Sequence, residues 1–414
     1  MTLSFLLGAA LRAGAPVVEA AASVRWRLGG SDNLAQRLVA AAPPAPAAIW
    51  VHGASVGELT SARVVIEALA HDHRVLVTTN STAGRDMVAR WGQPARLAPL
   101  DVPGALARFL DAVQPRLALS VEAEIWPLRS AMLARRGVRQ AVIGARMSER
   151  SGRRWARLPG IIGPILSRID ALSAQDGDSE ARLSALGVRP EAILPRLDLK
   201  LIAPARAGLP PDDPARGCTI LAASTHEGED EVVLAAWSRL RRAHPDLRLI
   251  MAPRHPARGD AVAAQIAAAG FAPGRRSGGD DRVPPGGILL ADTLGEMDRW
   301  YAAAGITIVC GSFADRGGHT PWEPAAHGSA IVTGPHVGNF VESYRALDAA
   351  RAAIRSAPDR LAADLDALLR DPGAARAMAQ RAHDVLRRRA GDPDALIAHL
   401  AGLARPTRSP DMNL

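Results

Sequence analysis

Residues 47–91 read AAIWVHGASVGELTSARVVIEALAHDHRVLVTTNSTAGRDMVARW, and in this stretch short apolar runs alternate with longer amphipathic ones. Strands that are buried on both faces read as continuous apolar runs, and helices between them give parallel β-α-β units. The same rhythm continues through residues 117–121, 140–143 and 171–174. Residues 31–202 are therefore predicted to form an α/β domain around a parallel sheet.

The rhythm stops at residues 203–217, APARAGLPPDDPARG, which are rich in Pro, Gly and Asp and lack periodicity. Such a stretch is typical of a linker between domains. A second α/β domain is expected over residues 218–414, with strands in CTILAAS, LRLIMAP, GGILLAD, TIVCGS and SAIVTG and with helices at the C-terminus. Two such domains place a cleft between them, and ligands of open α/β sheets bind beyond the carboxyl ends of the strands.

The composition permits an anionic partner without requiring one. The chain has 414 residues and 48% hydrophobic content, which is enough for two domains that each bury a core. Its net charge is +8, and Lys200 is the only lysine, so nearly all of the positive charge is arginine. Arginine holds phosphate and carboxylate in a bidentate fork and suits an anionic lipid surface. A genome-wide preference for Arg and Ala explains the same composition.

The two cysteines, Cys218 and Cys310, lie far apart and lack the spacing of metal ligands. They indicate neither a disulfide framework nor a zinc site, and they fit a reducing cytoplasm. No cofactor is expected for this chain.

Residues 1–30 are predicted to associate with a membrane surface. The apolar start at residues 3–11 is broken by Arg12 and Pro16, so it is shorter than the roughly 20 residues that a spanning helix needs. Its positive charge follows the apolar run, whereas a signal peptide carries the charge first. An interfacial anchor is the preferred interpretation. The alternative is an amphipathic helix that packs on the protein itself.

The loop after the first expected strand carries a carboxylate that could act as a base. In HGASVGELTSAR, Gly57 loosens the turn and Glu58 stands where a helix begins, so Glu58 could take a proton from an attacking hydroxyl. The structural alternative is helix capping, because Ser55 and Glu58 have the spacing of a capping box. The next loop, TTNSTAGRD, offers hydroxyls and Arg85 to an anion at a helix N-terminus.

The segment SVEAEIWP places two carboxylates, Glu122 and Glu124, after another expected strand. Residues two apart in an extended chain face the same side. Two carboxylates that are forced together raise one pKa, which suits acid–base work or the binding of sugar hydroxyls. A surface pair of glutamates would be unremarkable, but Trp126 and Pro127 follow within an apolar stretch, which favours a site.

Three loops of the second half have the composition of an anion- and sugar-binding site. AASTHEGED places Ser224 and His226 between a strand and a helix, where backbone N–H groups can receive phosphate. APRHP offers Arg254 at another strand end. GSFADRGGHTPWEPAAHG joins a glycine turn to His319 and Glu323, and such a carboxylate can bind sugar hydroxyls. A structural histidine would be the simpler explanation for His319 if it stood alone.

These segments together resemble the Kdo transferases of lipopolysaccharide assembly, which join 3-deoxy-D-manno-oct-2-ulosonic acid (Kdo) to a lipid A precursor. The resemblance runs from RLGGSDNLAQRL to the final helices. The segments that carry it, in the order of the family, are IWVHGASVGE, EAEIWP, ARMSERS, LAASTHEGEDE, APRHP, DTLGEM, GSFADRGGHTPWEPAAHG and GPHVGNF.

The resemblance implies the GT-B fold, two Rossmann-like domains with an interdomain cleft, at the cytoplasmic face of the inner membrane. It implies an inverting transfer of Kdo from CMP-Kdo to a lipid A precursor, with Glu58 as the catalytic base. The acceptor-binding residues would be Ser55, Gly57, Arg85, Glu122 and Glu124. The donor-binding residues would be Ser224, Arg254, Gly295, Met297, Ser312, Gly318, His319, Glu323 and Asn339. No metal is expected, because arginine and helix N-termini can offset the charge of the leaving phosphate.

Two departures from the family pattern bear on the identity of the substrates. Thr320, Pro321 and Trp322 stand between His319 and Glu323, where the family usually continues His-Asn-Leu-Leu-Glu, and Leu197-Asp198 replace a glycine and an amide. A paralogue with another acceptor or activated sugar, or a non-catalytic relative of the fold, stays open. Nucleic-acid binding is not expected, because 4% aromatic content leaves little for bases to stack on.

Overall fold

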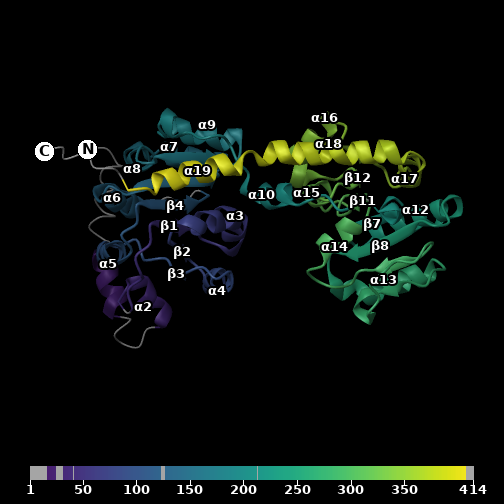
Figure 1. The fold of residues 1–414 in the computed structure, drawn as a ribbon, viewed down its shortest axis with the longest axis horizontal. Coiled ribbons are helices and arrows are strands. Elements are labelled where there is room, and N and C mark those ends of the chain that lie inside the picture. Colours follow the sequence, from purple (N-terminus) through teal and green to yellow (C-terminus); the bar gives the residue numbers. More distant parts are fainter. Residues whose placement is uncertain (1–15, 25–30, 41, 123–125, 212, 407–414) are drawn as a thin grey trace. The chain divides into compact units, whose positions relative to one another are not determined.

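Continuous apolar runs form the strands of two parallel sheets in the computed structural model, which describes residues 16–24, 31–40, 42–122, 126–211 and 213–406. The chain divides into two compact units. The first unit comprises Met1–Ala203 together with Ala390–Leu414, and the second comprises Pro204–Arg389. Each unit contains one of the two sheets (Figure 1).

The sheet of the first unit has six parallel strands in the order β3-β2-β1-β4-β5-β6. Val51 at its centre pairs with Val77 on one side and with Leu119 on the other, and all three side chains are buried. The strands are β1 (Ile49–His52), β2 (Val75–Thr79), β3 (Ala95–Leu97), β4 (Leu117–Val121), β5 (Arg139–Ala145) and β6 (Ala171–Ala174). The helices are a helix over residues 16–24, α2 (Asp32–Leu38), α3 (Val56–Asp72), α4 (Thr82–Arg90), α5 (Pro103–Val113), α6 (Pro127–Arg135), α7 (Glu149–Ala156), α8 (Pro159–Leu166), α9 (Gly177–Ala185), α10 (Leu199–Arg206) and α19 (Pro393–Leu403).

The sheet of the second unit has seven parallel strands in the order β13-β12-β11-β7-β8-β10-β9. Its strands are β7 (Thr219–Thr225), β8 (Arg248–Pro253), β9 (Gly274–Arg275), β10 (Ile288–Leu290), β11 (Ile306–Val309), β12 (Ala330–Thr333) and β13 (Ala353–Arg355). Its helices are α11 (Pro214–Gly217), α12 (Glu229–Ala243), α13 (Gly259–Ala268), α14 (Met297–Ala303), α15 (Trp322–Ala326), α16 (Val341–Ala349), α17 (Leu361–Arg370) and α18 (Pro372–Ala390). Trp237 of α12 is buried in a core that the strands share with α17.

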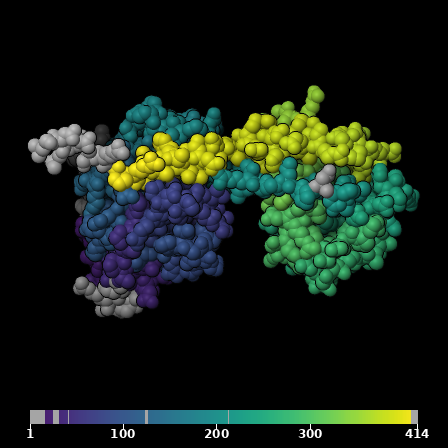
Figure 2. All heavy atoms as spheres, in the orientation of Figure 1, coloured from purple at the N-terminus to yellow at the C-terminus, as the bar shows by residue number. Residues whose placement is uncertain are grey.

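The C-terminal helix α19 belongs to the first unit, whereas the sequence predicted it in the second domain. Leu396 and Leu400 of α19 are buried in the same apolar cluster as Leu59 and Ile66 of α3. In Figure 1 α19 lies along the first unit, and Figure 2 shows it in yellow at the surface of that unit. Burial of this apolar face against α3 stabilises the position of α19 on the first unit.

The predicted linker also differs from the structure. Residues 203–217 contain the end of α10 and all of α11, and the chain passes from one unit to the other within α10. Pro204 lies inside α10, where a proline interrupts the helical hydrogen bonds, and the helix ends two residues later. Pro214 starts α11, a position that suits its fixed backbone angle.

Candidate active site

The predicted loops lie at the carboxyl edge of each sheet, at the point where the strand order reverses. In the first unit β1 lies between β2 and β4, and in the second unit β7 lies between β8 and β11. Loops on the two sides of such a point diverge and leave room for a ligand. The loop after β1 leads to Glu58, and the loop after β7 begins at His226, two residues beyond Ser224. The topology therefore places predicted residues where open α/β sheets bind ligands.

Glu58 forms the capping box that its spacing predicts. The Ser55 hydroxyl lies 3.3 Å from the backbone nitrogen of Glu58 and accepts its hydrogen bond, which caps α3. In return the Glu58 carboxylate accepts a 2.7 Å hydrogen bond from the N–H of Ala54 and a 3.0 Å bond from the Ser55 hydroxyl. Glu58 is half-buried, and Ser55 and Gly57 are exposed. Capping thus fixes the carboxylate at the helix N-terminus while part of it faces solvent.

Arg85 and Glu122 lie in the neighbouring loops of the first unit, and Glu124 lies outside the described residues. The Arg85 guanidinium pairs with Asp86 at 2.9 Å in the first turn of α4. Glu122 has a φ of 58°, in the left-handed region that a non-glycine residue rarely adopts, and its N–H donates to Ile143. A non-glycine residue held in this region stores strain, which is common at functional sites.

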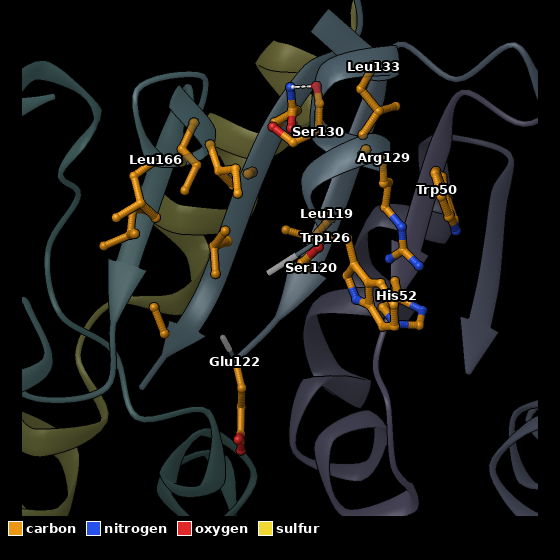
Figure 3. A pocket seen from close by; sticks show the side chains of 18 of the residues that line it. Trp50, His52, Leu119, Ser120, Glu122, Trp126, Arg129, Ser130, Leu133 and Leu166 are labelled. Atoms are coloured by element: carbon orange, nitrogen blue, oxygen red, sulfur yellow. Dashed lines mark hydrogen bonds between the residues drawn. The ribbon is translucent and has the colours of Figure 1, made fainter. Parts of the chain in front are cut away.

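A cluster that the sequence analysis missed fills a pocket over β4, β5 and β6. The Arg129 guanidinium is buried and lies 5.0 Å from the ring centroids of both Trp50 and Trp126. In Figure 3 the Arg129 side chain extends toward His52 and Trp126, whereas the Glu122 carboxylate points away from them. Cation–π contacts of a desolvated guanidinium are worth about 2 kcal/mol. They fix the Trp126 ring beside the loop that carries Glu122.

Asp101 accounts for part of the electrostatics beneath that pocket. Its carboxylate accepts hydrogen bonds from the backbone N–H groups of Leu128 and Arg129, at 3.3 and 2.9 Å. Burial raises the pKa of Asp101, and the charge of Arg129 and these two N–H groups oppose the rise. These two hydrogen bonds to Asp101 hold the start of α6 in place.

In the second unit Ser224 sits in a bulge at the end of β7. Its φ is 59°, and the pairing with β8 shifts register between Ala223 and Thr225. The N–H of Arg254 donates to the carbonyl of Thr225 at 3.0 Å, which brings the ends of β7 and β8 together. The Arg254 side chain is exposed, and within the described ranges no carboxylate lies within 4.0 Å of it. Its charge is therefore available to an anionic ligand.

The glycine turn after β11 requires glycine for steric reasons. Gly317 and Gly318 have φ angles of 81° and 75°. A Cβ on Gly318 would lie 3.0 Å from the carbonyl oxygen of His336, and one on Gly317 would lie 2.5 Å from the Asn339 amide nitrogen. Asn339 is exposed and donates through this amide to the carbonyl of Arg316. The turn thus brings its backbone close to Asn339, as the prediction of a shared site requires.

A pair of histidines joins the loop after β7 to the loop after β11. The Nε2 atoms of His226 and His319 are 2.9 Å apart, and the two rings are stacked with centroids 5.2 Å apart. Burial lowers the pKa of both imidazoles, and the positive charge of Arg254 lowers the pKa of His319 further. Arg316 lowers the pKa of His226 in the same way, whereas Glu229 opposes these shifts. Arg254 and Arg316 thus form a cationic edge of this sheet.

Acidification below about pH 6.5 is expected to destabilise the second unit. Because both imidazoles have a lowered pKa when folded, the unfolded chain binds protons first, so the unfolding free energy falls as the pH falls through this window. Urea unfolding at about pH 7.5 and about pH 5.5 measures the difference. In the double variant His226→Gln/His319→Gln this difference should shrink, and an unchanged difference would contradict the assignment.

Glu323 and the start of α14 lie in the same unit. The Tyr301 hydroxyl donates to the Glu323 carboxylate at 3.1 Å. Desolvation raises the pKa of Glu323 and Asp298 adds to the rise, whereas the Tyr301 bond and Arg254 lower it. Gly295 has a φ of 81° with open space around its Cα, and Met297 begins α14 partly buried against the core.

Ser312 is buried inside the loop after β11 and does not face solvent. It is fully buried, and its hydroxyl donates to the carbonyl of Val309 at 2.6 Å and accepts from the N–H of Gly334 at 2.8 Å. The side chain that the sequence predicted for donor binding therefore shapes the loop from within.

Comparisons with known proteins identify the family. The family model described as 3-deoxy-D-manno-octulosonic-acid transferase (kdotransferase) matches residues 32–203. The 3-deoxy-D-manno-octulosonic acid transferase of Bordetella pertussis is 35% identical over 86% of this chain and 88% of its own length. The chain belongs to the Kdo transferase family. The enzyme of the same name from Haemophilus influenzae is 32% identical over 83% of this chain and 84% of its own.

Solved structures agree with the fold of this Kdo transferase. UDP-GlcNAc 2-epimerase from Neisseria meningitidis has a TM-score of 0.54 at 10% identity, covering 85% of this chain and 98% of its own, which bears on the fold alone. The predicted α/β architecture of GT-B type, with two Rossmann-like domains, is confirmed. A C-terminal CMP-Kdo binding domain of WaaA from Acinetobacter baumannii is 30% identical over 41% of this chain and 89% of its own, with a TM-score of 0.40.

The two departures of this Kdo transferase from its family pattern lie in different units. Leu197 is buried in the core of the first unit, and Asp198, also of that unit, accepts the N–H of Lys200 at the start of α10. Trp322 is buried in the second unit, where the Arg389 guanidinium lies 5.7 Å from its ring centroid. The backbone N–H of Trp322 donates to the Thr320 hydroxyl at 3.3 Å. Only the second departure adjoins the glycine turn.

No helix in the described part of the chain is long and apolar enough to cross a bilayer. Among the same residues no group of three His, Cys, Asp or Glu side chains is arranged to hold a metal ion.

Proposed function

We propose that this Kdo transferase moves Kdo from CMP-Kdo to a hydroxyl of a lipid A precursor, with inversion at the anomeric carbon. The observation that carries the donor part is the cationic edge of the second sheet. Arg254 and Arg316 have no carboxylate within 4.0 Å among the described residues, and they lie around the His226–His319 pair. CMP-Kdo brings a phosphate and a carboxylate, which are the anions that such an edge attracts.

On the donor side, the arginines would offset the charge that develops on the departing CMP. Preorganised donors aimed at developing charge are often the largest contribution to catalysis. Arg254 suits the phosphate, because guanidinium recognises it in a bidentate fork. The glycine turn lets backbone approach the nucleotide, and Asn339 and Glu323 supply groups for hydroxyls of the donor. The remaining proposed donor residues are Ser224, Gly295, Met297, Gly318 and His319, whereas the buried Ser312 shapes the loop that leads to the glycine turn.

On the acceptor side, Glu58 would act as the general base. The acceptor hydroxyl gives its proton to the Glu58 carboxylate, its oxygen forms a bond to the anomeric carbon, and the bond from that carbon to the CMP phosphate oxygen breaks. Attack from the face opposite the leaving group inverts the carbon. The N–H of Ala54 and the hydroxyl of Ser55 hold the carboxylate in one orientation. The other proposed acceptor residues are Gly57, Arg85, Glu122 and Glu124.

We further propose that the enzyme works at the cytoplasmic face of the inner membrane, where a lipid acceptor is anchored. Residues 16–24 form a helix on which Val17, Val18 and Val24 are 69%, 57% and 55% exposed. Glu19 of this helix binds the N–H of Gly104 at 2.7 Å, which holds the helix on the first unit. Exposed valines on a docked helix favour contact with an interface.

Incubation of the purified protein with CMP-Kdo and a lipid A precursor, followed by mass spectrometry of the lipid, tests this function. A lipid mass increased by one Kdo or more is the expected result. No increase with any acceptor would favour a non-catalytic relative of the fold. An increase with a different activated sugar only would favour a paralogue, and Trp322 beside the glycine turn is where its donor preference would differ.

A further inference from the structure

Glu229 is a buried carboxylate that no predicted role includes. It is the first residue of α12, it is 0% exposed, and no cation among the described residues lies within 4.0 Å of it. The adjacent Asp230 is the residue that pairs with Arg258. A buried charge without a counter-ion is costly unless hydrogen bonds satisfy it. The groups that donate hydrogen bonds to the Glu229 carboxylate therefore indicate its role.

Five backbone N–H groups from two loops converge on the Glu229 carboxylate. Oε2 accepts from His226 at 3.0 Å and from Gly311 at 2.7 Å. Oε1 accepts from Ser312, Phe313 and Ala314, at 2.9, 2.8 and 3.4 Å. Hydrogen bonds to an ionised acceptor are about twice as strong as those between neutral groups. One side chain thus satisfies a run of amides that would otherwise be buried without partners.

The two loops that Glu229 joins both reach the cationic edge. The first loop begins at His226, just after Ser224 and Thr225 of β7, and the second leads to the glycine turn and His319. The His226–His319 contact ties the same two loops on the outer side. Because its carboxylate already occupies the N–H groups of residues 311–314, these amides are not available to a phosphate of the donor. The donor must therefore be held by the groups beyond them.

We propose that Glu229 is a positioning residue that holds both donor loops in their binding geometry before the nucleotide arrives. It does not touch the substrate. Its contribution appears as donor affinity, because a ligand that finds its loops already ordered does not have to order them. This inference rests on the proposed function in one respect, which is that the cationic edge binds the cytidine nucleotide.

The test is a calorimetric titration of CMP into the full-length protein and into Glu229→Gln, which keeps the shape but removes the charge. CMP affinity should fall about ten-fold or more, and the KM for CMP-Kdo should rise in proportion while kcat changes by less than about three-fold. Glu231→Gln is the matched control, because Glu231 is exposed on the same helix. A folded Glu229→Gln variant that binds CMP within about two-fold of the wild type overturns the inference.

If Glu229→Gln does not fold, hydrogen exchange tests the role of Glu229 instead. In the wild-type protein without nucleotide, the amides of residues 311–314 should exchange as slowly as those of β11, and rapid exchange there overturns the inference. Glu229→Asp, which keeps the charge on a shorter side chain, should speed exchange at these amides. If the wild-type protein binds no CMP while these amides remain protected from exchange, the proposed function is contradicted, whereas the structural role of Glu229 in ordering the loops is not.

Discussion

Replacing Glu58 by glutamine is expected to slow Kdo transfer by about 10²- to 10⁴-fold, the range that a general base contributes. Glutamine has the same shape and can still accept the hydrogen bond from the N–H of Ala54. It cannot take a proton from the acceptor hydroxyl at neutral pH. Single-turnover transfer from CMP-Kdo, measured with saturating donor, separates this loss from weaker binding.

Two variants distinguish catalysis by Glu58 from helix capping. Ser55→Ala removes the cap and should cost α3 about 0.5–2 kcal/mol of stability while much of the transfer rate remains. Glu67→Gln, on the same helix, removes an exposed carboxylate paired with Arg63 and should leave the rate unchanged. If Glu58→Gln and Ser55→Ala slow transfer equally, Glu58 is a capping residue and another base must be sought.

Gly334→Ala is expected to destabilise the second unit by about 2–3 kcal/mol, the upper range for overpacking. A Cβ at this position would lie 2.3 Å from the carbonyl oxygen of Ser312 and 2.7 Å from the backbone nitrogen of Phe313. Both atoms belong to backbone, so no side chain can move aside to relieve the contact. Because Glu229 holds the same segment, CMP affinity should fall as well. Hydrogen exchange of β11 and β12 measures the stability.

Gly338→Ala is the matched control, because nothing lies within 4 Å of the Cβ that it would add. Its effect on stability should stay within about 0.5 kcal/mol, as for most surface substitutions. Equal stability of the Gly334 and Gly338 variants would show that the loop after β11 shifts freely, against the packing described above.

The strands of both sheets were predictable because parallel strands are buried on both faces. Leu117–Val121 and Ala171–Ala174 match the expected ranges. The strand end at Ser224 and the loops that lead to Glu58 and Gly318 could also be placed, because loops after parallel strands meet at one edge of a sheet. The capping box at Ser55 and Glu58 was predicted as an alternative and is present in the structure.

Other features depend on contacts between distant residues, which a sequence pattern does not show. The amphipathic pattern of α19 fits either unit, and only the packing of Leu400 against α3 places it in the first. Arg129 has the appearance of an ordinary surface arginine until the fold brings Trp50 and Trp126 to its faces. Glu229 stood within the quoted segment AASTHEGED, but its partners come from residues 311–314, more than eighty positions away.

The most direct test of Kdo transfer is a time course that follows CMP release and lipid glycosylation in one reaction containing CMP-Kdo and a lipid A precursor. We expect one CMP for each Kdo found on the lipid, no release of CMP without the acceptor, and loss of both products in Glu58→Gln. Release of CMP that does not depend on the acceptor, or a lipid that gains no mass while the protein is folded, would contradict the proposed function.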